Sequence, residues 1–208
     1  MTHIFSKILD TAINEIAKLP GIGKRTALRL ALHINRLPSE EVEQLLSAIK
    51  NLKTELHSCE ICHNLSDNRI CNICNNNKRN PKLICVVQDI RDVIAIEATH
   101  QFSGVYHVLG GVISPMDGIG PGQLTLQNLF DRITTTPPEE VILALPATIE
   151  GDTTNFYIYK NIRDNVKRIT TIARGIGIGE ELEFTDEVTL GRSFIARTDF
   201  ETAYSKNS

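Results

Sequence analysis

Residues 57–74 read HSCEICHNLSDNRICNIC and hold four of the five cysteines of the chain. Cys59 and Cys62 form one Cys-x-x-Cys pair, and Cys71 and Cys74 form a second pair after eight intervening residues. Each pair presents two thiolates from a tight knuckle, and four thiolates complete a closed, tetrahedral zinc site of the structural kind. The spacing therefore predicts one structural Zn²⁺ per chain, with two disulfides or an iron–sulfur cluster as the alternatives.

The chain as a whole has an ordinary globular composition. It contains 208 residues, of which 41% are hydrophobic and 23% charged, so it can bury a core without help from disulfides. It has neither an apolar run of membrane length nor an N-terminal signal segment. We therefore expect a cytoplasmic protein whose cysteines are metal ligands or core thiols. Cys85 lies in an apolar run and is expected in the core, whereas His57 and His63 are expected on the surface.

The net charge of −3 is divided unevenly along the chain. Residues 1–80 carry 11 Lys and Arg against 8 Asp and Glu, a balance of +3. Residues 81–208 carry 11 against 17, a balance of −6. A basic front and an acidic back indicate two different partner surfaces.

Residues 1–56 are predicted to form a helical domain. Apolar residues recur at three- and four-residue spacing over residues 4–17, which is typical of an amphipathic helix. Two further helices are predicted, one over residues 24–35 and one from an N-cap at Ser39 to about residue 56. The apolar seam of the third helix consists of Val42, Leu45, Leu46, Ile49, Leu52 and Leu56.

The turn between the first two helices, residues 19–27, reads LPGIGKRTA. Gly21 and Gly23 flank an apolar residue in a tight hairpin, where backbone N–H groups and the dipole of the next helix form an anion site. Lys24, Arg25 and Arg29 add positive charge beside it. The stretch resembles a helix-hairpin-helix motif, which binds DNA phosphates without reading the sequence; a plain connection with a solvated basic face is the alternative. A nucleotide-binding P-loop is excluded, because Arg25 follows the lysine where Ser or Thr is required.

The pattern changes again after the cysteines. Residues 57–80 are assigned to the zinc knuckle, and beyond Pro81 short apolar strands alternate with helix-like stretches. This alternation predicts an α/β domain over residues 81–176, with a mostly parallel sheet and helices on both faces. Residues 177–208 form a C-terminal tail with a strand-like Val188–Leu190. The predicted strands are 83–87, 105–109, 141–145 and 169–173, and the predicted helices are 91–99, 123–133 and 153–166.

Acidic residues follow two of these strands. Gln88-Asp89 comes after the first strand and Glu150-Gly151-Asp152 after the third. Open α/β sheets place their sites at the carboxyl ends of the strands, where two or three carboxylates can hold Mg²⁺ for phosphoryl chemistry. The alternative is that Glu150 and Asp152 only cap a helix that begins near Thr153. The glycines of residues 175–179 are interpreted as a flexible loop.

The order of these parts resembles the RecR family of bacterial recombination mediators over nearly the whole chain. Helix-hairpin-helix, four-cysteine knuckle and acidic α/β domain follow one another as in that family. Five further stretches look like its motifs: Arg91–Val93, Tyr106–Gly111, Ser114–Pro121, Ile149–Asp152 and Ile172–Gly175. The resemblance implies that the α/β part is a Toprim domain, the module shared with topoisomerases and primases. One position departs from the Toprim pattern, because Gln88 stands where an acid is expected at the end of the first strand.

The resemblance also implies a function in DNA repair without catalysis. Members of the family form ring-like oligomers, typically tetramers, that bind gapped, single- and double-stranded DNA without sequence preference. They act with RecO and RecF to load RecA onto single strands coated by single-strand-binding protein. Carried over residue by residue, the DNA path is lined by Gly21, Gly23, Lys24, Arg25 and Arg29, and RecO meets an acidic surface at Glu150 and Asp152. Zinc then fixes the hairpin domain against the Toprim domain, and the tail joins subunits.

Two other classes of function compete with this one. A Mg²⁺-dependent Toprim enzyme that cuts or joins DNA strands needs a full carboxylate set and a nucleophile, typically a tyrosine. Gln88 breaks that set, and the four tyrosines, Tyr106, Tyr157, Tyr159 and Tyr204, stand in no suggestive context. A zinc-stabilised adaptor that binds only proteins is the third class, and DNA binding at varied salt separates it from the leading one.

Overall fold

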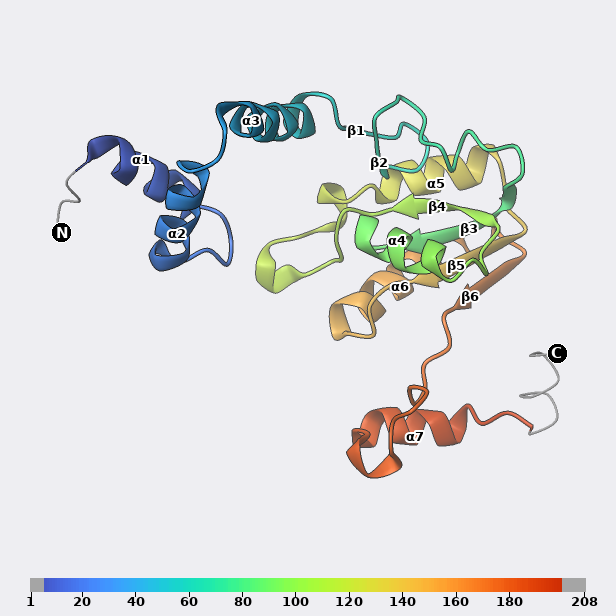
Figure 1. Cartoon of the computed structure of the whole chain (residues 1–208). Helices are drawn as coiled ribbons and strands as arrows, with labels where there is room; N and C mark the ends of the chain where they lie inside the picture. The colour runs from blue at the N-terminus through green and yellow to red at the C-terminus, as the bar shows by residue number, and fades with distance from the viewer. Residues whose placement is uncertain (1–5, 200–208) are drawn as a thin grey trace. The chain divides into compact units, whose positions relative to one another are not determined.

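The computed structural model describes residues 6–199, which fall into two compact units that divide between Leu56 and His57. Figure 1 traces the chain through both units. Each unit has its own secondary structure and its own core, so each is described by itself. Within residues 6–199, no helix combines the length and the apolar character needed to cross a bilayer.

The first unit contains three helices, α1 (Lys7–Ile16), α2 (Lys24–Ile34) and α3 (Ser39–Thr54). Its core is small, with Ile13, Ala27 and Ala31 buried between α1 and α2. Ile22, the apolar residue between the two turn glycines, packs against this core and thereby anchors the turn. All three predicted helices are present, but α1 begins at Lys7 after the N-cap Ser6, and residues 4 and 5 of its predicted range lie outside the described residues. Ser39 is the first residue of α3 rather than its N-cap. Pro38 takes that place, and its carbonyl accepts the N–H groups of the first turn.

The apolar seam of α3 is largely exposed in the single chain. None of the residues of α3 is buried, and the side chains of Leu46, Ile49 and Leu52 are each more than half exposed. An exposed leucine on its own is ordinary, but a seam of them along one helix marks a surface that another apolar surface can cover.

The second unit begins with the knuckle, whose strands β1 (His57–Ser58) and β2 (Leu65–Ser66) pair antiparallel. A four-stranded sheet follows, with strand order β4-β3-β5-β6 and every neighbouring pair parallel. Its elements alternate along the chain as predicted (Figure 1), which confirms the α/β class. They are β3 (Asn80–Val87), α4 (Ile90–Ala98), β4 (Gly104–Val108), α5 (Leu126–Thr135), β5 (Glu140–Ala144), α6 (Ile149–Ile162) and β6 (Arg168–Thr171).

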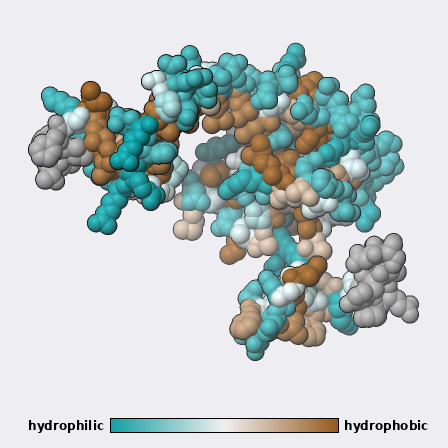
Figure 2. All heavy atoms as spheres, viewed as in Figure 1, coloured by the Kyte–Doolittle hydropathy of each residue, from teal (hydrophilic) through white to brown (hydrophobic). Residues whose placement is uncertain are grey.

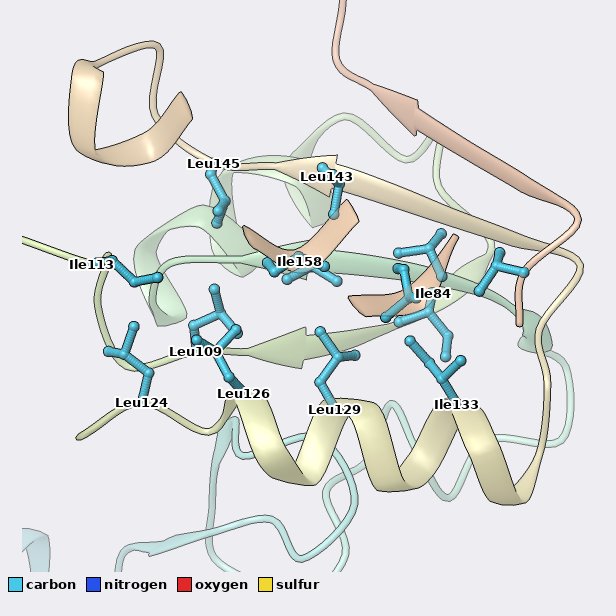
Figure 3. Packing of buried hydrophobic residues seen from close by; sticks show 14 of the residues in the cluster. Ile84, Leu109, Ile113, Leu124, Leu126, Leu129, Ile133, Leu143, Leu145 and Ile158 are labelled. Atoms are coloured by element: carbon cyan, nitrogen blue, oxygen red, sulfur yellow. The ribbon is translucent and has the colours of Figure 1, made fainter. Parts of the chain in front are cut away.

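The core lies on both faces of this sheet, because successive side chains of a strand point to opposite sides. Ile84 and Val86 of β3 pack on the face covered by α5 and α6, whereas Cys85 and Val87 pack with Val93 of α4 on the other. Figure 3 shows Leu126, Leu129 and Ile133 of α5 reaching toward the sheet. Burial on both faces explains the uninterrupted apolar run of β3 and confirms the core position of Cys85. Each such side chain contributes about 1.5–3 kcal/mol of burial energy.

The loop between β4 and α5 contains two short 3₁₀ turns, Pro115–Asp117 and Pro121–Gln123. The second turn delays the start of α5 to Leu126, three residues after the predicted start. The strand-like stretch Val188–Leu190 is helical, so that prediction was wrong. It lies in α7 (Glu187–Ile195), where Asp186 caps the helix by accepting the N–H of Thr189 at 2.9 Å.

The C-terminal segment exposes several large apolar side chains. Phe184, Val188, Phe194 and Ile195 are all at least 64% exposed, and Figure 2 shows hydrophobic atoms at the surface of this segment. Residues 175–181 form a glycine loop without helix or strand, as predicted. Tyr204 and the rest of the predicted tail beyond residue 199 lie outside the described residues.

Candidate zinc site and nucleic-acid interface

The four cysteines of the knuckle converge on one point. Their sulfur atoms all lie within 4.8 Å of one another, and Cys62 Sγ and Cys71 Sγ are 3.5 Å apart. A disulfide requires about 2.05 Å, so this spacing is that of separate thiols around a shared centre. Zinc–sulfur bonds of about 2.3 Å in a tetrahedron place sulfur atoms roughly 3.8 Å apart. The ligand set therefore fits a structural Zn²⁺, and Cys59, Cys62, Cys71 and Cys74 are its ligands.

Backbone N–H groups prepare the sulfur atoms for the metal. The N–H of Cys71 donates to Cys59 Sγ at 3.3 Å, and that of Cys74 donates to Cys71 Sγ at 3.4 Å. Burial by itself raises the pKa of Cys59. Hydrogen bonds from backbone N–H groups, of which that of Cys71 has the largest effect, outweigh burial and lower the pKa to about 7. Hydrogen bonding with Cys74 and burial hold the pKa of Cys62 far above its ordinary value. Four thiolates cannot coexist here without a cation, and the metal supplies that charge.

The knuckle docks on the edge strand of the sheet. The N–H of Val108 in β4 donates to the Cys62 carbonyl at 2.8 Å, so a zinc ligand and the α/β domain share a backbone hydrogen bond. His63, expected on the surface, is half-buried, and its Nε2 is shielded from solvent. Its ring meets that of His107 edge-on with centroids 5.2 Å apart. The expectation for His63 was therefore wrong, because His107 of β4 packs against its ring.

The turn between α1 and α2 has the geometry of an anion site. Gly21 has a φ of +79°, a conformation that favours glycine. Gly23 is the N-cap of α2 and has no side chain to occupy the first N–H groups of the helix. These donors remain available to a phosphate, and the helix dipole favours a negative charge there.

Three cations surround this turn. Lys24 and Arg25 occupy the first turn of α2, and Arg29 lies one turn further along. All three are exposed, and none of them forms an ion pair within residues 6–199. Free cations beside open N–H groups are what a phosphate backbone requires.

Helix α6, which contains the acidic stretch of the α/β domain, begins earlier than expected. The helix starts at Ile149 rather than near Thr153, because Thr148 caps it by accepting the N–H of Gly151 at 3.1 Å. Glu150 and Asp152 therefore lie within the first turn, where negative charge stabilises the helix. Gly151 is required by packing, since a Cβ there would lie 2.0 Å from the Pro146 carbonyl oxygen.

Asp152 is already engaged by a cation. Arg174, 22 residues further along the chain, reaches its two carboxylate oxygens at 2.5 and 3.1 Å. The guanidinium of Arg174 holds the pKa of Asp152 below its ordinary value. Glu150 is half-buried and forms no ion pair within the described part of the chain. Of the two predicted acidic residues, only Glu150 offers an unpaired carboxylate.

The acids beside Gln88 are engaged as well. Asp89 caps α4 and pairs with Arg91, its Oδ2 lying 2.9 Å from Arg91 Nε. Asp92 accepts the backbone N–H groups of Gln88 and Asp89, each at 3.0 Å. Within residues 6–199, the four cysteines are the only group of three or more acidic, histidine or cysteine side chains close enough to share a metal. The carboxyl edge of the sheet thus lacks a converging carboxylate set.

Tyr106 has a structural role that the sequence does not reveal. It is fully buried in β4, and its hydroxyl donates to Glu97 at 2.6 Å. Glu97 also pairs with Arg79, which in turn donates to the Phe102 carbonyl at 3.0 Å. Burial, followed by this hydrogen bond, raises the pKa of Tyr106 far above its ordinary value. A buried, protonated phenol makes a poor nucleophile.

Family comparisons agree with this arrangement part by part. The chain matches the RecR helix-hairpin-helix model over residues 9–53, the RecR four-cysteine zinc finger model over 56–76, the Toprim model over 82–173 and the RecR C-terminal model over 175–198. These matches define a Toprim protein that carries a helix-hairpin-helix and a four-cysteine zinc finger.

Relatives of nearly the same length identify the family within this class of Toprim proteins. Recombination protein RecR of Flavobacterium johnsoniae is 52% identical over 202 residues, which cover 97% of this chain and 98% of the relative. The protein of the same description from Cytophaga hutchinsonii is 54% identical over 198 residues, 95% of this chain and 97% of the relative. That from Bacteroides fragilis is 53% identical over 195 residues, 94% and 95% of the two chains. The chain belongs to the RecR family.

Proposed function

We propose that this chain is a non-enzymatic DNA-binding mediator of recombination and repair. In this proposal it acts in the cytoplasm, at the nucleoid, as a ring-like homo-oligomer, with four subunits, on gapped DNA. With RecO and RecF it helps to load RecA onto single strands coated by single-strand-binding protein. Family membership supports the general role, and the chain's own residues supply the physical argument for DNA contact.

The observation that carries the proposal is the open anion site at the start of α2. Gly21 and Gly23 leave backbone donors uncovered, and Lys24, Arg25 and Arg29 are exposed cations without ion-pair partners in the described chain. Contacts of this kind go to the phosphate backbone and carry no sequence information. They are suited to a protein that must bind any gapped DNA.

A Mg²⁺-dependent strand-cutting function finds less support in the same geometry. Gln88 brings no charge, Asp89 and Asp152 are paired with arginines, and Asp92 is occupied by backbone N–H groups. A divalent ion for phosphoryl transfer requires several converging oxygen ligands. Tyr106 is buried behind Glu97, which removes one candidate nucleophile.

Two exposed apolar surfaces support assembly from copies of this chain. One is the seam of α3 and the other is the C-terminal segment around Phe184 and Phe194. Both lie outside the α/β core, and covering them removes apolar area from water at about 25 cal/mol per Å². A ring needs each subunit to have two contact surfaces, and these are the two that we assign.

We assign the partner surface to the start of α6. Glu150 is free to meet a cation, and Ile149 beside it is 83% exposed. Asp152 contributes negative potential but must share its charge with Arg174. A basic protein such as RecO is the expected occupant, and the more negative charge of residues 81–208 would speed its approach.

The test is binding of the purified full chain to a labelled gapped duplex in Mg²⁺, with strand integrity read from the same gel. We expect a retarded band and intact strands. On duplex DNA, log affinity falls with log salt by about 0.9 per phosphate contact. The double variant Lys24→Ala, Arg25→Ala is therefore expected to flatten the slope by roughly 2.

The matched control is Lys50→Ala, Lys53→Ala, which removes the same charge from α3 of the same unit. We expect the slope of log affinity against log salt for this variant to differ from that of the unmodified chain by less than about 0.45, which corresponds to half of one phosphate contact. Equal slopes for both double variants would refute the hairpin as the contact site. Cut or religated strands would refute the non-enzymatic function.

A further inference from the structure

Arg132 is a half-buried cation without a carboxylate partner. It belongs to α5 on the side of the knuckle, where it lines a groove together with Glu60, Ile61 and His63. Within residues 6–199 it forms no ion pair. Arginine in a protein remains charged, and withdrawing a charge from water is costly unless something compensates it.

One hydrogen bond fixes the guanidinium. Arg132 Nη1 donates to the Tyr106 carbonyl of β4 at 2.9 Å. That carbonyl lies on the edge strand to which the knuckle docks, two residues before the N–H of Val108 that donates to the Cys62 carbonyl. A neutral carbonyl satisfies one donor but does not neutralise the charge, so this bond orients Arg132 without explaining why a cation is there.

Two acids line the same groove, but Glu60 pairs with Arg69 and Asp131 accepts a hydrogen bond from Gln127 at 2.9 Å, so neither pairs with Arg132. The cysteines of the knuckle are the remaining source of negative charge. Burial lowers the pKa of Arg132, and the charges of Cys74, Cys62, Cys59 and Cys71 all act in the opposite direction. The geometry agrees, because Ile61 and His63, which line the groove with Arg132, stand on either side of the ligand Cys62. Zn²⁺ with four thiolates has a net charge of −2, which the metal alone does not neutralise. The two arginines of the knuckle segment itself, residues 57–80, are both engaged: Arg69 is 80% exposed and paired with Glu60, and Arg79 is paired with Glu97.

We propose that Arg132 is the counter-charge of the zinc centre: held by the Tyr106 carbonyl, its guanidinium offsets part of the negative charge of the loaded four-cysteine site and raises the affinity for Zn²⁺. Arg132 is thus a positioning residue rather than a ligand. The same side chain couples metal occupancy to the α/β domain, because it belongs to α5 and bonds to β4. Outer-sphere partners of this kind typically change metal affinity by 10–100-fold.

The experiment measures the zinc affinity of the full chain by competition with a zinc-binding dye. Arg132→Met keeps most of the packing of the side chain but removes the charge, and we expect it to bind Zn²⁺ about tenfold more weakly. Arg132→Lys keeps the charge and is expected to remain within about threefold of the unmodified chain. Arg69→Met removes an exposed cation of the knuckle itself, where solvent screens the charge, and is the matched control with an expected change below about twofold.

Urea unfolding of the zinc-loaded variants separates this role from simple packing. If Arg132 only supports the Tyr106 carbonyl, Arg132→Met lowers the unfolding midpoint while its zinc affinity stays unchanged, and the proposal is overturned. An equal loss of zinc affinity in Arg69→Met also overturns it, because any nearby cation would then suffice. Should Arg132→Met fail to fold, Arg132→Lys decides: near-normal zinc affinity supports the counter-charge, and a tenfold loss contradicts it.

Discussion

The zinc knuckle and the parallel sheet are neighbours along the chain, yet they are stabilised in different ways. In the knuckle, the buried apolar cluster consists of Cys59, Cys62 and Cys71 themselves, with Ile73 and Cys74 beside them. The hydrophobic core of the α/β domain contains fifteen buried residues on one face of the sheet and five on the other. The knuckle therefore depends on one metal ion, whereas the sheet depends on many small contributions of burial.

This contrast shows where each region is vulnerable. Removing one ligand or the metal removes almost everything that orders the knuckle, because a structural zinc site in peptides is worth about 10–16 kcal/mol. Removing one buried side chain from the core of the sheet costs only a small part of the burial energy that stabilises the whole sheet. The two regions meet at the bond between Cys62 and Val108, which allows the effects to be separated experimentally.

The largest expected effect is that of metal removal. Chelation, or the substitution Cys62→Ser, is expected to abolish amide-exchange protection in the knuckle while leaving β3 and β5 protected. The reason is that the sheet core contains none of the zinc ligands. Hydrogen exchange of the full chain measures this, and the amide of Val108 reports the junction because it donates to the Cys62 carbonyl. Loss of protection across the whole sheet would show that the two regions fold as one unit.

A smaller effect is expected from a cavity in the sheet core. Leu129 of α5 is fully buried, and Leu129→Ala is expected to lower the free energy of unfolding by about 2–5 kcal/mol. Zinc content should remain at one ion per chain. Urea unfolding measures the change, and Ile94→Ala on α4, where the side chain is 62% exposed, is the control. A zinc-depleted Leu129→Ala protein would show that the metal site depends on the sheet core as well as on the edge strand and Arg132.

The smallest effect is expected at the paired acid of α6. Arg174 lowers the pKa of Asp152 in the folded protein. The ion pair therefore stabilises the fold fully at pH values above the ordinary pKa of an aspartate, near 3.9. This stabilisation is lost as the pH falls through the lower pKa of the folded state. Since the Asp152 side chain is 43% exposed, Asp152→Asn is expected to cost less than about 1 kcal/mol at pH 7.

Unfolding midpoints between pH 7 and pH 3 measure this difference, which should shrink toward the acidic end. Asp164→Asn is the control, because Asp164 is 86% exposed and its nearest cation lies 3.8 Å away. A gap between the Asp152→Asn variant and the unmodified chain that widens on acidification would show that Arg174 does not stabilise the ionised carboxylate.

The sequence by itself determined the features that depend on residues close together in the chain. The ligand set of the knuckle follows from two Cys-x-x-Cys pairs, and the turn at Gly21 and Gly23 follows from local backbone freedom. The alternation of strands and helices follows from the period of the apolar residues. The sequence predicted the boundaries of helices less well. Helix α6 begins at Ile149 rather than near Thr153, because the side chain of Thr148 caps it and Pro146 lies close to Gly151.

Only the tertiary structure decided which charges are free. Asp152 meets Arg174 across 22 residues, and Arg132 of α5 is brought beside cysteines that precede it by more than fifty positions. His63 is half-buried because an edge strand covers it. Composition and spacing carry no information on such pairs, since the energy of a charge depends on its distance to other charges and on its exposure to water. Both quantities exist only after the chain has folded.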